Sequence, residues 1–356
     1  MSVARLRLRH QRLIGSPLAT AADVVAWFGA VQAQDYAAAK WAVALRTRGA
    51  TDADVERACD DGAILRTHVL RPTWHFVAPA DLRWLLALTG PRVKQAMAYY
   101  HRQLELDERT FRRSNAVLAK ALAGAQCTRA ELARALTAAR IAAPGDRLVH
   151  LLMRAELDAV ICSGARRGKH ATYALVEERC PPAPPLDRDA ALARLAQRYV
   201  ASHGPVLVAD FAWWSGLTAA DARRAFELAA LPTRVIEEQP YYLAEPAPLP
   251  RLRLRSPLVH LLPNFDEYLV AYKHRAAVTD AAVPAAVGTP IALLSTPIVV
   301  LDGRVIGTWR RTITRNAVTV TTSLTVPLDR PQRAALDVAI ARYGRFLGLP
   351  ATGSLA

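Results

Sequence analysis

The chain has 356 residues, of which 52% are hydrophobic, enough to bury the cores of two or more folded domains. Its 46 Lys and Arg residues outnumber 31 Asp and Glu residues, and the formal charge of +15 favours nucleic acid as a partner, although a high-GC genome, which enriches Arg and Ala together, also gives a basic chain. No signal peptide or membrane-spanning run is recognisable, so we expect a cytoplasmic, nucleoid-associated protein with no membrane partner. The cysteines lack C-x-x-C spacing, so we expect no zinc or other metal site and no cofactor; they are Cys59, Cys127, Cys162 and Cys180.

The first clear helix should begin after Thr20, because Thr20 and Asp23 have the spacing of a capping box. Its apolar residues recur at i, i+3, i+4 and i+7, which predicts one buried stripe and places the end of the helix near Val31. The residues of this stripe are Val24, Trp27, Phe28 and Val31.

Two strands should follow a second helix that starts near Thr51. The segments AILRTHVL and TWHFVA are rich in residues that favour strands, and the turn between them holds Arg71 and Pro72. A helix from Asp81 to about Leu88 completes this first unit of the chain, for which we predict the bounds 1–110.

The second unit, residues 111–180, should contain a helix, a second helix, a strand, a basic loop and a strand, which is the order of a winged helix. The loop ARRGKH would be the wing, where side chains reach phosphates easily, although a solvated turn fits the same residues. The second helix also carries basic residues opposite its apolar face. The residues that we predict to bind DNA in this unit are Arg147, His150, Arg154, Arg166, Arg167 and Lys169.

A Pro-rich linker at residues 180–188 should separate a third unit, residues 186–250, with the same order of helices and strands. Residues 256–356 differ, because apolar and polar residues alternate and turn signals stand at 302–303 and 315–316. This pattern predicts a strand meander that closes a small barrel or sheet, followed by a last helix. The predicted fold class is therefore α+β, with three tandem winged-helix units and a C-terminal small β-barrel or meander.

Four segments resemble a known group of proteins: VQAQDYAAAKWAVALR, RTHVLRPTWHFVAPADLRWLL, FAWWSGLTAADAR and LLPNFDEYLVAYKHR. They resemble the bacterial winged-helix DNA-binding domain family, which includes the AlkZ-type alkylpurine DNA glycosylases. The resemblance covers nearly the whole chain. It implies three winged helices and a small β-barrel around a concave DNA channel. It also implies that Gln32 and Gln34 act at the lesion, whereas a neighbouring branch linked to crosslink repair has aspartate at the second position.

Two glutamines suit a substrate whose N-glycosidic bond is already weak. In extended chain Gln32 and Gln34 would share a face and point into one cavity. A primary amide cannot take a proton at neutral pH, but it can orient water and stabilise a cation. An N7-alkylated guanine is cationic and can leave without protonation. We see no obvious catalytic lysine, which favours a monofunctional hydrolase. The alternative is that both glutamines cap the helix or bind phosphate.

Six further residues are candidates for binding, catalysis or structure. Arg71, at the predicted turn, should bind phosphate. His68 and His75 could reach DNA or the lesion, but packing in the core fits them at least as well. Asp35 could act as general base if Gln34 does not hold the water. Asp266 and Glu267 should form ion pairs, with Lys273 or Arg275 as partners.

The sequence therefore predicts a monomeric DNA glycosylase that hydrolyses alkylated purine nucleotides of the N7-alkylguanine type in double-stranded DNA, with bulky adducts or crosslinks among the candidate lesions. The alternative is a non-catalytic winged-helix DNA-binding protein or transcriptional regulator. The length of the chain and its paired glutamines favour the enzyme, whereas the absence of a charged group from the motif favours the regulator.

Overall fold

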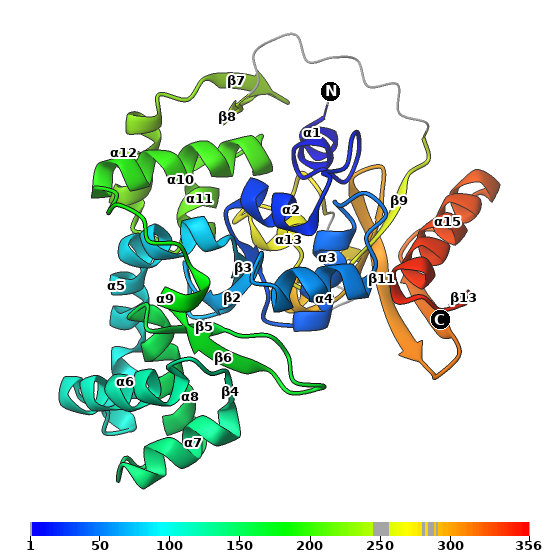
Figure 1. Cartoon of the computed structure of the whole chain (residues 1–356). Helices are drawn as coiled ribbons and strands as arrows, with labels where there is room; N and C mark the ends of the chain where they lie inside the picture. Colours follow the sequence, from blue (N-terminus) through cyan, green and yellow to red (C-terminus); the bar gives the residue numbers. More distant parts are fainter. Residues whose placement is uncertain (1, 245–255, 280–281, 284–287, 290, 356) are drawn as a thin grey trace.

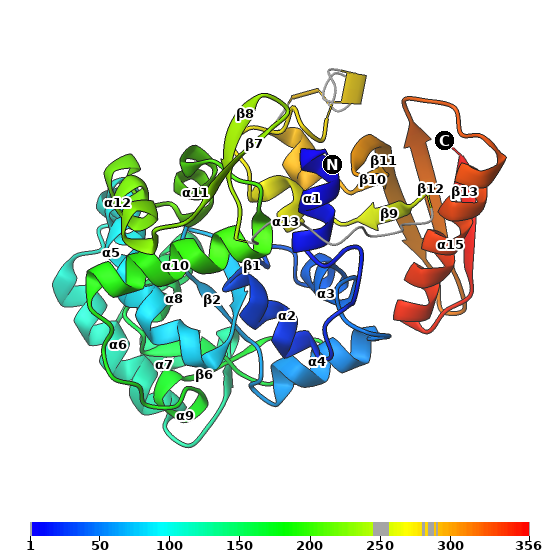
Figure 2. The same cartoon turned by 90° about the horizontal axis from the view of Figure 1, so that it is seen from above.

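The structure is a computed structural model that describes residues 2–244, 256–279, 282–283, 288–289 and 291–355 (Figure 1). It is a mixed α+β protein, as predicted. The C-terminal sheet and its helix lie at one end of the molecule, the helices α5 to α8 of residues 79–157 lie at the other, and the N-terminal helices lie between them (Figures 1 and 2). No helix in the described part of the chain is long and apolar enough to cross a membrane.

The first 103 residues form five helices and a three-stranded antiparallel sheet in the order β1-β3-β2. The capping box at the start of α2 is present, with Asp23 N–H donating to Thr20 Oγ1 and Thr20 N–H donating to Asp23 Oδ2. The helix ends earlier than predicted, because Gly29 at φ +81° caps it. The elements are α1 (Val3–His10), α2 (Ala21–Phe28), β1 (Val31–Gln32), α3 (Tyr36–Ala44), α4 (Asp52–Asp60), β2 (Leu65–His68), β3 (Trp74–Val77) and α5 (Pro79–Gln103).

Helix α5 is much longer than predicted, because it continues past Gly90 and Pro91 to Gln103. Apolar residues on both sides of Pro91 are buried, Leu88 and Val93 among them, so packing on both sides of the proline favours a continuous helix despite the missing hydrogen bond. A Cβ added at Gly90 would lie 3.4 Å from the carbonyl oxygen of Leu157, so the glycine lets α8 pack closely at this point.

The second unit has the predicted order of helix, helix, strand, loop and strand. The capping box formed by Thr128 and Glu131 starts its first predicted helix, α7. Its sheet has the order β4-β6-β5, and its apolar side chains form a buried cluster of their own that runs from Leu106 to Leu175. The elements are α6 (Glu108–Leu122), β4 (Cys127–Thr128), α7 (Arg129–Ala138), α8 (Gly145–Leu157), β5 (Ile161–Ser163), β6 (Thr172–Leu175) and α9 (Val176–Arg179).

The helices of the third unit pack against the first unit as well as against their own strands. Side chains of α10 and α11 share a buried cluster with α5 and with Tyr272. The N-cap Thr218 accepts from Asp221 N–H, and the strand pair follows where expected. The elements are α10 (Arg188–His203), α11 (Val208–Ser215), α12 (Ala219–Ala229), β7 (Thr233–Ile236) and β8 (Gln239–Tyr242).

The Pro-rich linker before α10 is exposed at residues 181–185, as the sequence predicted. We expect limited proteolysis of the native chain to cut first within 181–185, because a protease needs an exposed segment that it can extend. Mass spectrometry of the first two fragments checks this. Cuts inside residues 128–175, with the linker intact, would contradict the predicted boundary between the second and third units.

The C-terminal strands form an open sheet in the order β13-β12-β11-β10-β9. The meander was predicted correctly, and Asp302 and Gly303 form the turn between β10 and β11 with positive φ. The closed-barrel alternative is wrong for the described strands, because β9 and β13 are opposite edges and α15 packs against both. The elements are β9 (Val259–Leu262), α13 (Glu267–Val270), η1 (Ala292–Ser295), β10 (Ile298–Leu301), β11 (Arg304–Ile313), β12 (Val318–Leu324), α15 (Arg330–Leu347) and β13 (Ala351–Leu355).

The main hydrophobic core joins the two ends of the sequence. One buried cluster contains side chains from residues 4–76 together with side chains from residues 261–346. Trp41 on α3 shows the connection, since its Nε1–H donates to the carbonyl oxygen of Leu261 at 2.8 Å and its ring contacts Tyr343 and Phe346. Figure 2 shows α2 to α4 beside this C-terminal sheet.

Candidate active site

Gln32 is held from two directions at the end of β1. Its backbone N–H donates to Glu267 Oε1 at 2.8 Å, and its side-chain Oε1 accepts from Arg71 Nη2 at 2.7 Å. The residue is buried, with 8% of its surface exposed. Its amide group is therefore fixed in orientation by a charged donor, and Nε2 makes no hydrogen bond to any described residue.

Gln34 lies two residues further on, in the turn that leads from β1 into α3, and its side chain is exposed. Its Oε1 accepts from the backbone N–H of Trp74 at 3.2 Å. The guanidinium of Arg66 holds the turn itself, donating to the carbonyl oxygens of Ala33 at 3.0 Å and of Gln34 at 3.4 Å. One glutamine is thus buried and one is accessible, and a single cavity shared by both side chains stays a prediction.

Arg71 turns inward rather than toward solvent. Besides its bond to Gln32, its Nη1 donates to the carbonyl oxygens of Trp213, at 3.4 Å, and of Trp214, at the C-terminal end of α11. Burial lowers the pKa of the guanidinium, and the charge of Glu267 opposes that shift. Phosphate binding by Arg71 stays a prediction, but its hydrogen bonds here order the site.

Glu267 is almost fully buried and gathers three donors. In addition to the Gln32 N–H, Trp214 Nε1–H donates to Oε2 at 3.0 Å and His203 Nε2–H donates to Oε2 at 3.3 Å. Burial alone would raise its pKa, but the hydrogen bond and charge of His203, the Gln32 N–H and the charge of Arg71 lower it below its ordinary value. Glu267 therefore supplies the negative charge behind Gln32 and Arg71.

The expected ion pairs of Asp266 and Glu267 with Lys273 or Arg275 are wrong. Asp266 forms a buried bidentate pair with Arg46, at 2.8 and 2.9 Å, and caps α13. Both acids lie at the start of α13, where the chain passes through the interior, so each takes a partner from a distant segment.

Asp35 is the N-cap of α3. Its Oδ1 accepts from Ala38 N–H at 3.0 Å, and its Oδ2 accepts from Asn264 Nδ2 at 3.2 Å. The side chain is half-buried beside the exposed Gln34. These bonds explain the position of Asp35 as a helix cap, and its role as a general base stays a prediction.

Both histidines of the first sheet are in the protein interior. His68 pairs with Glu156 of α8 through its ring Nδ1 and its backbone N–H. His75 is fully buried, its Nδ1 donates to the carbonyl oxygen of Thr73 at 2.9 Å, and burial lowers its pKa well below the ordinary value. Burial therefore favours the neutral form of His75.

The three residues predicted to bind DNA from α8 contact α5, α6 and the segment that connects them. Arg154 forms two bonds with Glu108, at 2.7 and 2.8 Å, and Arg147 donates to the carbonyl oxygen of Leu104. The ring of His150 stacks on Tyr100 with the centroids 5.9 Å apart. These contacts join α8 to the α5–α6 connection, and DNA binding by this face stays a prediction.

The loop between β5 and β6 is the most accessible of the predicted DNA-binding segments. Arg167 and Lys169 are exposed, whereas Arg166 is half-buried and lies 3.6 Å from Glu56. Arg167 donates to Glu131 at 2.8 Å, which ties the loop to α7. Between the loop and α7 lies a groove of about 830 Å³, lined by Arg129, Arg167 and Lys169 among others.

We expect the double variant Arg166→Ala/Arg167→Ala to bind duplex DNA more weakly whatever the sequence, because both guanidiniums would release counterions from phosphates. The slope of log K against log salt should fall by about one unit for each phosphate interaction that the substitutions remove. Fluorescence anisotropy across a salt series measures this slope. Arg188→Ala/Arg224→Ala is the matched control, since both arginines are exposed and paired with aspartates. An unchanged slope in the loop variant would exclude the loop from the interface.

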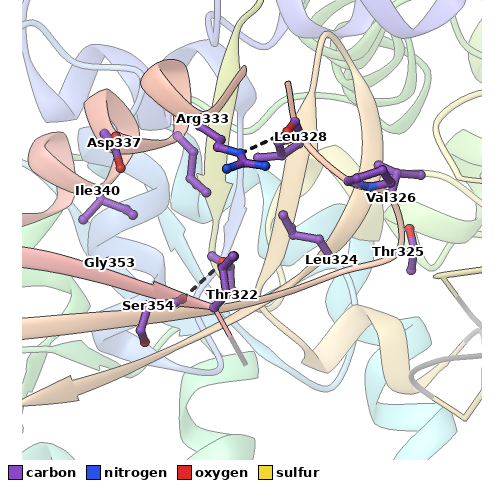
Figure 3. A pocket seen from close by; sticks show the side chains of 13 residues that line it. Thr322, Leu324, Thr325, Val326, Leu328, Arg333, Asp337, Ile340, Gly353 and Ser354 are labelled. Carbon is purple, nitrogen blue, oxygen red and sulfur yellow. Dashed lines mark hydrogen bonds between the residues drawn. The ribbon is translucent and has the colours of Figure 1, made fainter. Parts of the chain in front are cut away.

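A further cavity, of about 600 Å³, lies in the C-terminal unit between the sheet and α15 (Figure 3). Apart from Arg333 and Asp337 its lining is uncharged, and it includes neither glutamine. Among the described residues, no group of three or more His, Cys, Asp or Glu side chains could hold a metal ion. This cavity is therefore a less suitable place for the predicted chemistry than the glutamine motif.

Sequence reasoning missed the residues that surround Gln32. Glu267 was assigned to a peripheral ion pair, and Trp213 and Trp214 were not assigned at all. Their only signal in the sequence was the resemblance, because they fall in the segments FAWWSGLTAADAR and LLPNFDEYLVAYKHR. Nothing in the spacing of residues 32, 214 and 267 indicates that they meet.

Comparison with known proteins identifies the family of the chain. A family model described as DNA glycosylase AlkZ-like matches residues 25–346. The curated protein "Interstrand DNA cross-link repair glycosylase" of Streptomyces sahachiroi is 26% identical over 337 residues, which cover 85% of each chain. The solved structure of Streptomyces sahachiroi DNA glycosylase AlkZ has a similar fold, with a TM-score of 0.75 at 24% identity over 99% of this chain and 98% of that one. The chain belongs to the AlkZ-like DNA glycosylase family.

Proposed function

We propose that this protein hydrolyses the N-glycosidic bond of N7-alkylguanine-type nucleotides in duplex DNA, with Gln32 and Gln34 at the reacting centre. The observation that carries the proposal is the exposed amide of Gln34 beside Gln32, whose side-chain amide is held by Arg71 and whose backbone N–H is held by Glu267. A network of this kind preorganises a polar group, so little reorganisation is needed when charge develops on the sugar.

Each glutamine keeps acceptor capacity for this task. An amide oxygen accepts two hydrogen bonds, and the Oε1 atoms of Gln32 and Gln34 each accept one from the protein. The remaining lone pairs can hold the attacking water and face the sugar as it becomes cationic. The base needs no proton to leave, because alkylation at N7 has already made the ring cationic.

The proposed partner is double-stranded DNA, bound by a monomer through three winged-helix units and a concave channel. Bulky N7 adducts and interstrand crosslinks share the cationic guanine with methyl adducts, and the name of the Streptomyces sahachiroi relative favours crosslinks among them. The basic loop with Arg166, Arg167 and Lys169 would bind the phosphate backbone of this DNA. The protein would then be associated with the nucleoid.

The test is excision from a duplex that contains one N7-methylguanine. After incubation with the enzyme, hot alkali should break the strand at the lesion, because alkali cleaves an abasic site. Duplexes that carry a bulky N7 adduct and an N7–N7 crosslink extend the same assay. If the chain binds all three duplexes and breaks none of them, the non-catalytic DNA-binding alternative replaces the proposal.

A further inference from the structure

A small cavity lies directly behind the Gln34 turn, and we propose that it holds the guanine ring of the substrate, gripped by Glu156. This inference rests on the proposed function and names the part of the substrate that is recognised. The cavity has a volume of about 90 Å³. It lies between the first and second units, and the residues of its lining that matter here are Tyr36, Arg66, Trp74, Glu156, Ser163 and Tyr173.

The cavity is connected to the glutamine motif by two of its own lining residues. The backbone N–H of Trp74 donates to the side chain of Gln34, and the guanidinium of Arg66 donates to the carbonyl oxygens of Ala33 and Gln34. A base in this cavity would therefore have its glycosidic bond next to the Gln34 turn, where the water must attack.

The walls suit a flat, aromatic ligand. The guanidinium carbon of Arg66 lies 4.4 Å from the ring centroid of Trp74, and Tyr36 and Tyr173 contribute two more aromatic rings. Extruded bases are commonly stacked on aromatic side chains and on Arg planes. A purine that stacks on these groups would gain affinity from the contact.

Glu156 gives this cavity its chemical preference. Glu156 is only 2% exposed, yet it lines the cavity. Oε2 accepts hydrogen bonds from the backbone N–H and from the ring Nδ1 of His68. Oε1 accepts only a 3.4 Å bond from Trp74 Nε1 and keeps one lone pair free. Guanine presents an N1–H donor to this lone pair. Adenine presents an unprotonated N1, so two acceptors would face each other.

This orientation leaves room for a bulky substituent on N7. In guanine, N1 belongs to the six-membered ring, whereas N7 and the sugar-bearing N9 belong to the five-membered ring at the opposite end. With N1 toward Glu156, the N7 substituent and the sugar both point to the mouth. There the cavity meets the 830 Å³ groove, with which it shares Arg66, Trp74, Ala171 and Tyr173.

The charges in the cavity favour release of the base. An N7-alkylguanine ring is cationic until its glycosidic bond breaks, and it then leaves as a neutral molecule. Arg66 repels the cationic ring while Glu156 attracts it, so Glu156 secures binding. Loss of the charge on cleavage removes the attraction to Glu156 that secured binding, so the neutral base leaves more easily.

Two variants test the cavity. Glu156→Gln keeps the shape but removes the charge, and Ala171→Trp fills the mouth from an exposed position. Asp337→Asn, in the C-terminal cavity of Figure 3, is the control. We expect wild-type enzyme to excise N7-methylguanine faster than N3-methyladenine. Glu156→Gln should reduce this preference about 10- to 100-fold, the effect of one hydrogen bond to a charged group. Ala171→Trp should slow excision of both bases.

Direct binding separates this inference from the proposed function. Isothermal titration with free N7-methylguanine should show binding to wild type and to Asp337→Asn, weaker binding of adenine, and no binding to Ala171→Trp. If free N7-methylguanine does not bind wild type, or binds Ala171→Trp equally well, the cavity assignment is overturned even in an active enzyme. If the free base binds as expected but no duplex is cleaved, the proposed function fails and the binding site stands.

Discussion

Replacing Gln34 with alanine should slow excision of N7-methylguanine by about 30- to 1000-fold, the effect of removing one preorganised interaction with the transition state. Its side chain is exposed and has a single hydrogen bond to the backbone of Trp74, so folding and lesion binding should change little. Single-turnover excision measures the rate, and anisotropy with lesion-containing duplex measures binding. The two measurements together separate loss of catalysis from loss of affinity.

Gln32→Ala should slow excision to a similar extent, but it should also lower stability, because Arg71 loses the acceptor that it meets at 2.7 Å. The double variant should be little slower than the slower single variant, since both amides act on one water. Circular dichroism is the control for folding.

Gln34→Glu should keep activity or raise it if this side chain faces the water. If both alanine variants excise at the wild-type rate, the glutamines are structural. The catalytic residue is then Asp35, or the protein is the non-catalytic DNA-binding alternative.

The largest loss of stability should come from Asp266→Ala. The change leaves the guanidinium of Arg46 buried without its carboxylate, and breaking a buried ion pair in this way typically costs about 3 to 5 kcal/mol. Arg46 and Asp266 are 1% and 2% exposed, so water cannot replace the missing partner. Chemical unfolding followed by tryptophan fluorescence reports this core, because Trp41 lies within it.

Asp189→Ala is the matched control for that measurement. Asp189 also pairs with an arginine, Arg224, but both side chains are about half exposed, at 51% and 52%. Its removal should cost at most about 1 kcal/mol. If Asp266→Ala is no less stable than Asp189→Ala, the buried pair does not hold the two ends of the chain together.

Local signals in the sequence predicted local structure well. The capping box at Thr20 and the turn at Asp302 depend on residues within one turn of chain, and the structure contains both. The length of α5 could not be predicted in the same way. Gly90 and Pro91 would end an isolated helix, and only packing against α8 makes the continuous helix favourable.

The site could be predicted only in part, because its surroundings also depend on packing between distant segments. The motif itself and its place after an apolar helix are local, so Gln32 and Gln34 could be identified. Their environment depends on contacts between residues more than 200 positions apart, such as the bond from Gln32 N–H to Glu267. Arg71 was assigned to DNA because an arginine beside a proline at a turn is usually exposed, and nothing nearby in the sequence indicates its inward contacts.

The core that joins residues 4–76 to residues 261–346 has a consequence for synthesis of the protein in the cell. The first residues to leave the ribosome must wait for nearly the last ones before their apolar side chains are covered. At about 5 to 20 residues per second, the 270 residues between Phe76 and Phe346 take roughly 15 to 50 s to make. During that time α2 and α3 expose Val25, Phe28 and Trp41, so nascent chains should be clients of ribosome-associated chaperones.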